Sequence, residues 1–174
     1  MDARAQNILG AWLLLAADTV GAATEQAAGH RGALAATLVV LRQEPGIGID
    51  RLAATLQVSQ PAAVRLVNQL VTSGLARRGT DGADGRRTSV RLTAAGARAA
   101  GAVLTARQRA LDDLLSGLPP AERDQLGRLA EKACVAKVDG WLQGQQVCRL
   151  CDTASCPPAS CPVDAAAGPT PPVG

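Results

Sequence analysis

The stretch that decides the fold is residues 59–96, SQPAAVRLVNQLVTSGLARRGTDGADGRRTSVRLTAAG. It opens with Ser59 and a proline in the first turn, which predicts the start of a helix that runs to about Thr72. Two Asp-Gly pairs then predict a tight turn, so residues 75–92 are expected to form a β-hairpin. Thr93 can cap a further helix. The stretch therefore predicts a helix, a hairpin and a second helix in close succession.

Two more helices are predicted immediately before this stretch. One covers residues 33–43 and is ended by Glu44-Pro45-Gly46, because the residue before a proline is biased away from the helix. Ile47-Gly48-Ile49 is predicted as a short strand, after which Asp50 can cap a short helix over residues 51–56. A short helix, a turn, a longer helix and a basic hairpin follow one another as in a winged helix-turn-helix.

Long helices rich in apolar residues are predicted on both sides of this domain. Residues 3–29 carry apolar side chains on two sides, and further helices are predicted over residues 94–115 and 121–142. Burial on two sides is typical of an intertwined dimer, and Trp12 and Trp141 are expected near its base. With no Phe and no Tyr, strand-favouring residues are scarce. The predicted fold class is mainly α, a winged helix-turn-helix with long N- and C-terminal dimerisation helices and a small β-hairpin wing.

Positive charge is concentrated in the same region. The net charge is +3, yet residues 65–91 alone contain six Arg and two Asp. A basic window in a nearly neutral chain indicates an anionic partner, and double-stranded DNA is the first candidate. The capped start of the helix can bind a DNA phosphate, and the outer face of that helix can contact base edges in the major groove. The Arg side chains at the hairpin tip can enter the minor groove, where the negative potential is strong. The residues predicted to contact DNA on these grounds are Ser59, Gln60, Arg65, Asn68, Gln69, Arg77, Arg86 and Arg87.

Three motifs in this region resemble the signature of MarR-type transcriptional regulators. They read Gly74-Leu75-Ala76-Arg77-Arg78, then Asp84-Gly85-Arg86-Arg87, then Val90-Arg91-Leu92-Thr93-Ala94-Ala95-Gly96. The resemblance covers about residues 5–142 and implies an obligate homodimer with intertwined end helices and one winged helix per protomer. It also implies that Asp84 braces Arg86 in the minor groove. On this resemblance we expect a DNA-binding transcriptional repressor that acts as a homodimer on a palindromic operator.

Some sensing mechanisms of MarR-type proteins are excluded by residues that this chain lacks. It has no Tyr and no Cys before Cys134, which excludes a peroxide-sensing Cys hydrogen-bonded to two Tyr. His30 is its only His, which excludes a zinc-sensing site built from several His and carboxylates. A small-molecule effector, which many such proteins bind, stays open.

Four of the five cysteines crowd near the end of the chain with the spacing C-x2-C-x4-C-x4-C; they are Cys148, Cys151, Cys156 and Cys161. Four thiolates can close a tetrahedral zinc site, so zinc is the predicted cofactor. An iron–sulfur cluster is the alternative, because it also takes four Cys ligands. A regulatory disulfide stays open as well. Cys134 is expected to be a buried, small apolar residue.

No set of residues typical of catalysis is found, so the chain is not expected to be an enzyme. The longest apolar run, Ile8–Ala17, is too short to span a bilayer, which predicts a cytoplasmic protein without a membrane partner. The competing hypothesis is an iron–sulfur or thiol redox protein with the helical domain as a carrier. The expected parts are 1–32 (N-terminal dimerisation helix), 33–96 (DNA-binding domain), 97–145 (C-terminal dimerisation helices), 146–163 (Cys-rich metal-binding segment) and 164–174 (disordered tail).

Overall fold

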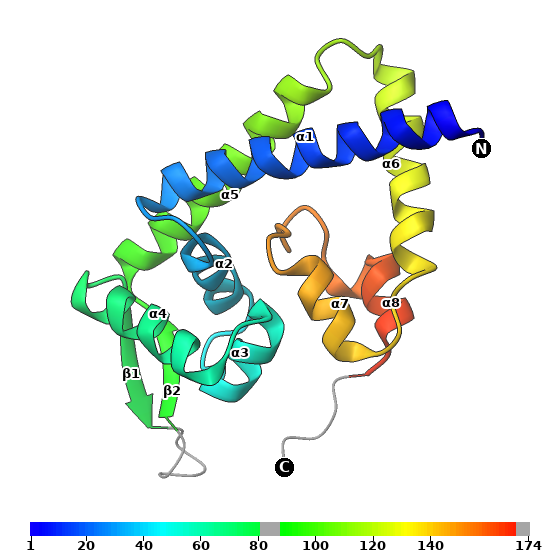
Figure 1. Ribbon diagram of the computed structural model, residues 1–174. Helices are drawn as coiled ribbons and strands as arrows, with labels where there is room; N and C mark the ends of the chain where they lie inside the picture. The colour runs from blue at the N-terminus through cyan, green and yellow to red at the C-terminus, as the bar shows by residue number, and fades with distance from the viewer. Residues whose placement is uncertain (81–87, 170–174) are drawn as a thin grey trace.

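The computed structural model describes residues 1–80 and 88–169. Within these ranges the chain is mainly helical, with one antiparallel sheet of two strands (Figure 1). This confirms the predicted fold class. The elements are α1 Ala3–Ala28, α2 Leu34–Gln43, α3 Ile49–Leu56, α4 Gln60–Thr72, β1 Ala76–Thr80, β2 Thr88–Leu92, α5 Ala94–Leu114, α6 Pro120–Val135, α7 Trp141–Cys148 and α8 Pro162–Ala167, with a 3-10 turn at Pro158–Ser160.

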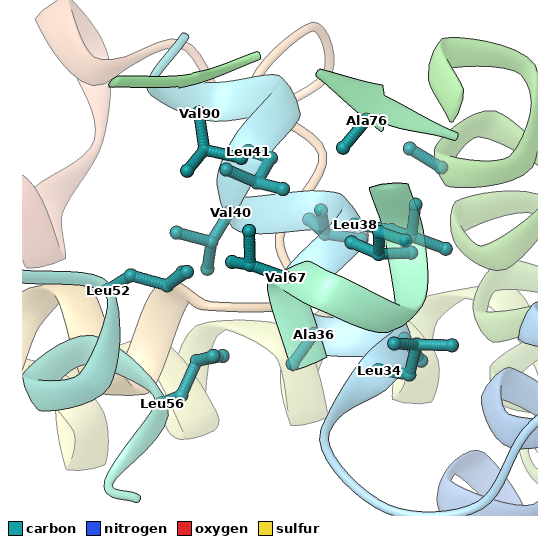
Figure 2. Packing of buried hydrophobic residues seen from close by; sticks show 14 of the residues in the cluster. Leu34, Ala36, Leu38, Val40, Leu41, Leu52, Leu56, Val67, Ala76 and Val90 are labelled. Carbon is teal, nitrogen blue, oxygen red and sulfur yellow. The ribbon is translucent and has the colours of Figure 1, made fainter. Parts of the chain in front are cut away.

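The core of the winged helix surrounds α2. Every residue from Leu34 to Leu41 is buried, because α3, α4, α5 and the β-hairpin pack around this helix. Leu52 of α3, Val67 of α4 and Val90 of β2 point toward the residues of α2 in the interior of the domain (Figure 2). A helix that is apolar all round is the kind that lies at the centre of a core. The buried cluster therefore sets the positions of α3 and α4 relative to the hairpin.

Side-chain caps fix the ends of the two helices that flank the hairpin. The Ser59 hydroxyl accepts a hydrogen bond from the Ala62 N–H and starts α4 as predicted. The Thr93 hydroxyl accepts from the Gly96 N–H at 3.1 Å and donates to the Gly74 carbonyl at 2.8 Å. One threonine thus caps α5 and ties it to the turn before β1.

Helix α1 lies beside α5 and leaves much of its own apolar surface exposed (Figure 1). Among the described residues it is the one helix long and apolar enough to cross a membrane, judged by length and composition alone. The prediction from the unbroken run Ile8–Ala17 missed this property, because apolar residues continue beyond Asp18. The exposed apolar side chains on this helix are Ile8, Leu9, Leu13, Leu14 and Leu15.

The strand predicted at Ile47-Gly48-Ile49 is wrong. Gly48 has an extended backbone and precedes the first residue of α3, Ile49, so Asp50 lies in the first turn rather than at the cap. Ile47 is buried in the core, which accounts for the apolar pattern that suggested a strand. A single hydrogen bond from the Gly46 N–H to the Val90 carbonyl holds this segment against β2.

The single helix predicted over residues 121–142 is also wrong. Helix α6 ends at Val135, and a separate helix, α7, begins at Trp141. Gly140 lies in the left-handed region, with φ of 88°, and separates the two helices. The disordered tail predicted from residue 164 is wrong for its first part, since α8 covers Pro162–Ala167 with Val163 and Ala167 buried. Figure 1 shows the result: α6 leads away from α5, and α7 turns back beside α3.

Candidate nucleic-acid interface and cysteine cluster

The outer face of α4 presents polar side chains at its start and middle. Ser59, Gln60 and Arg65 are exposed. The amide of Gln60 donates to the carboxylate of Asp50 at 2.5 Å, which joins the start of α4 to the first turn of α3. At the same end, the Ser59 hydroxyl accepts the Ala62 N–H, and Pro61 carries no N–H. This face therefore offers both hydrogen-bond donors and a positive charge to an anionic partner.

Like Gln60, two further predicted contact residues on α4 already have partners within the protein. Asn68 is exposed and accepts a 2.7 Å hydrogen bond from the guanidinium of Arg78 on β1. Gln69 is half-buried, and its amide lies 3.0 Å from Nδ1 of His30. The Arg78 contact braces the hairpin against α4, whereas the His30 contact directs Gln69 toward the connection between α1 and α2.

The β-hairpin continues the basic surface. Arg77 and Arg78 are exposed on β1, and Arg77 is paired in register with Arg91 of β2. Four exposed Arg side chains, Arg65, Arg77, Arg78 and Arg91, thus lie on α4 and the adjoining strands. Such a group can bind phosphates regardless of base sequence. The predicted contacts Asp84, Arg86 and Arg87 lie outside the described residues, so their roles stay predictions.

The four clustered cysteines lie at consecutive turns of the C-terminal part. Cys148 ends α7, and the Cys151 N–H donates to its carbonyl at 2.8 Å. The Cys156 N–H closes the next turn on the carbonyl of Asp152 at 2.9 Å, and Cys161 stands directly before α8. All four line one cavity of about 400 Å³, together with Glu44, Arg51 and Trp141. The fold therefore gathers the four thiols around one space.

The thiols shift one another's pKa in two pairs. A hydrogen bond with Cys148 lowers the pKa of Cys151 to about 6, against the effect of burial and with help from the Arg107 guanidinium. The same hydrogen bond, then burial and the other three thiols, raise the pKa of Cys148 far above its usual value. A hydrogen bond with Cys161 raises the pKa of Cys156 to about 11. Across residues 1–80 and 88–169, no three Cys, His, Asp or Glu side chains are arranged to hold a metal ion as they stand.

Cys134 lies apart from this cluster on α6. It is half-buried rather than buried, so the expected packing role is only partly met. Its position outside the cavity separates it from the four clustered cysteines.

The part of the chain that carries the four clustered cysteines, residues 141–167, is attached directly to the helix-turn-helix. The amide of Gln43, the last residue of α2, donates to the carbonyls of Cys151 and Cys148 at 2.8 and 3.2 Å. The amide of Gln146 donates to the Ala54 carbonyl of α3 at 3.0 Å. These bonds join residues about a hundred positions apart, so no local signal in the sequence indicated them.

An aromatic contact adds to this attachment. The Arg51 guanidinium lies 4.1 Å from the ring centre of Trp141 and forms a 3.2 Å ion pair with Glu44. Trp141 therefore packs on α3 within the protomer, and its expected place near a dimer base stays a prediction. Sequence reasoning missed Gln43 and Arg51 for this role.

A second cavity, of about 590 Å³, lies between α5 and the cysteine-bearing part. Arg42, Arg107 and Arg109 line it, and Cys151 and Cys156 form part of its wall. Three guanidinium groups on one cavity favour an anionic occupant.

Comparisons with known proteins agree with this geometry. A protein of Thauera aromatica, whose name assigns it to transcriptional regulation of the hcr operon, is 34% identical over 89 residues, which are 51% of this chain and 54% of that protein. The match therefore spans about half the length of this curated relative. The structure of RV1404 from Mycobacterium tuberculosis covers 80% of this chain and 97% of its own, at 23% identity and a TM-score of 0.68. A mutant of S. aureus MepR bound to an oligodeoxyribonucleotide covers 75% and 96%, at 22% identity and a TM-score of 0.57.

The fold and the basic face define a winged helix-turn-helix protein. Residues 35–87 match the model of the MarR family, and this segment contains α2, α3, α4 and the start of the hairpin. These comparisons support a MarR-type winged helix-turn-helix protein, with the family match itself confined to residues 35–87. The similarity that the three motifs indicated is thereby confirmed.

Proposed function

We propose that this protein is a DNA-binding repressor that acts as a homodimer on a palindromic operator. The observation that carries the proposal is the exposed face of α4, which lies beside the Arg-bearing hairpin. Arg65 on α4 and Arg77 on β1 are both exposed, and the Asn68–Arg78 hydrogen bond holds the two elements together. A helix and a hairpin fixed in this way suit the major groove and the adjacent minor groove of one duplex.

Two relatives support the choice of DNA as the partner. The MepR mutant is bound to an oligodeoxyribonucleotide, and the Thauera aromatica protein is named for the regulation of an operon. A protein that binds chromosomal DNA would act in the cytoplasm, which is the location that we propose. The cavity lined by Arg42, Arg107 and Arg109 supports a small anionic molecule as an effector.

The apolar face of α1 supports the homodimer. Leu14 is 69% exposed, and Ile8, Leu13 and Leu15 are each more than half exposed. Contiguous exposed apolar surface of this kind marks a protein interface. Since α1 already packs along α5 within the protomer, a second copy that presents the same face would bury these side chains on a two-fold axis.

Binding to duplex DNA tests the proposal. Fragments of genomic DNA are selected on the immobilised protein, and the affinity for the best fragment is measured for three variants. We expect Arg65→Ala and Arg86→Ala each to weaken binding by about 1–3 kcal/mol, with Arg65→Ala also changing the sequence preference. Arg128→Ala, which removes one exposed charge from α6, is the matched control and should bind like the wild type.

Salt dependence gives a second readout. The affinity should fall steeply as salt rises, because Arg–phosphate contacts release counterions from DNA. If no selected duplex binds better than random DNA, or if both interface variants bind like Arg128→Ala, the proposal is wrong.

A further inference from the structure

We propose that Cys148, Cys151, Cys156 and Cys161 hold one thiophilic metal centre per protomer, and that this centre fixes the cysteine-bearing part of the chain to α2 and α3. We refer to residues 141–167 as the C-terminal segment. The metal site stands on its own geometry, whereas its effect on DNA affinity rests on the proposed function.

The backbone supports a chelating site. Three turns, closed by the N–H groups of Cys151, Cys156 and Cys161, place the thiols at the edges of one cavity. Cys148 and Cys151 come from the start of this stretch and Cys156 and Cys161 from its end, and all four line that cavity. Four thiolates are the ligand set that zinc and iron–sulfur clusters prefer. Metal binding would have to draw the four thiols together, since no three of them are arranged around an ion as they stand.

The C-terminal segment has few apolar side chains to hold it together. Within it only Gly144, Cys161, Val163 and Ala167 are buried, while Leu142 and Val147 are exposed. A stretch with so small a core usually needs cross-links or a metal for stability. Metal ligation would supply that stability, because the free energy of metal binding becomes free energy of folding.

The attachment to the helix-turn-helix passes through the same residues. Gln43 binds the carbonyls of two of the four cysteines, so the end of α2 is held by the backbone that carries the ligands. The Arg51–Trp141 stacking and the Gln146–Ala54 hydrogen bond hold α7 against α3. Because α3 packs on α4, loss of the metal would loosen the packing that supports α4 and would weaken DNA binding.

Metal content tests the first half of the proposal. The full chain is purified without oxygen and analysed for zinc, iron, acid-labile sulfide and visible absorbance. We expect stoichiometric metal, with colourless zinc-loaded protein indicating a zinc site and coloured protein with sulfide indicating an iron–sulfur cluster. Cys151→Ser should lose the metal, while Cys134→Ser, which changes the cysteine outside the cavity, should retain it. Wild-type protein that contains no metal and takes up none when zinc is added overturns the proposal, as does protein whose thiols are recovered as two disulfides.

DNA affinity tests the second half. Gln43→Ala keeps all four thiols but removes both hydrogen bonds to the cysteine carbonyls. It should bind metal stoichiometrically yet bind DNA at least about fivefold more weakly than the wild type, a typical size for coupling between sites. Gln125→Ala, the same change at an exposed position on α6, is the matched control. Circular dichroism checks that each variant is folded.

The outcomes separate the two proposals. Metal-loaded wild type that binds no DNA refutes the proposed function and leaves the metal site standing. Metal removal and Gln43→Ala that both leave DNA affinity unchanged refute the link between the site and the helix-turn-helix.

Discussion

Gly96 lies where α5 passes against Leu75, the residue directly before β1. A Cβ at this position would lie 1.9 Å from the carbonyl oxygen of Leu75, which is backbone and has little room to move. The same glycine donates its N–H to the Thr93 cap. The sequence contained this glycine within the motif that ends in Thr93-Ala94-Ala95-Gly96, but only the structure shows that it is required by contact rather than by a turn.

We therefore predict that Gly96→Ala lowers the free energy of unfolding by about 2–3 kcal/mol, since overpacking against backbone forces a shift of the helix. Gly127 on α6, where a Cβ would meet nothing within 4 Å, is the matched control. Gly127→Ala should raise the stability by up to about 1 kcal/mol, the difference between Gly and Ala in a helix. Urea unfolding of the two variants measures both effects, and equal midpoints would contradict this account.

Single elements were predictable where their signals are local. Ser59 and Thr93 mark helix starts by themselves, and the two Asp-Gly pairs mark the hairpin, so α4, β1, β2 and α5 were all anticipated. The α3 start was not, because Gly48 takes the capping position ahead of Asp50. The break between α6 and α7 depends on the backbone of Gly140. The apolar pattern extends across that glycine, which made one long helix the simpler expectation.

The Thr93 cap gives a prediction at this scale. Thr93→Val keeps the shape of the side chain and removes the hydrogen bond from Gly96 and those to the Gly74 and Leu75 carbonyls. We expect a loss of about 1–2 kcal/mol in the free energy of unfolding, the usual cost of a lost helix cap. Thr105→Val, on an exposed position within α5, makes the same chemical change and should cost less than half as much. Thermal unfolding followed at 222 nm compares them, and similar losses would show that the cap is unimportant.

At the scale of the whole molecule, contacts distant in sequence decided what could not be predicted. The four cysteines were found from their spacing, and the candidate DNA-binding face from the order of helix and hairpin. The docking of α7 on α3 was not found, because Gln146 and Ala54 are 92 positions apart and carry no pattern that links them. The metal site itself stays a prediction.

The dimer gives a prediction for the whole molecule. Leu14→Glu places a charge on the exposed apolar face of α1 and should weaken dimerisation at least about tenfold, since a buried unpaired carboxylate is costly. Val71→Glu, an apolar-to-charged change on α4, is the control and should leave the dimer intact. Sedimentation at micromolar concentration measures both. In the wild-type dimer the two copies of α4 should lie about 34–36 Å apart, one turn of duplex. A wild-type monomer would refute this assembly.

The exposed length of α1 also has a consequence for biosynthesis. This helix leaves the ribosome before α2, α3 and α4 are made, and well before its neighbour α5 exists. During that interval the leucines of α1 can pack neither against α5 of the same chain nor against a second protomer. Exposed apolar surface of this kind aggregates or binds chaperones. Nascent chains that stop short of Ala94 should therefore bind trigger-type holdases and precipitate when those are depleted. Pairing of neighbouring nascent chains on one messenger RNA would shorten the time for which the apolar face of α1 is exposed. Dimer assembly during translation would therefore reduce aggregation.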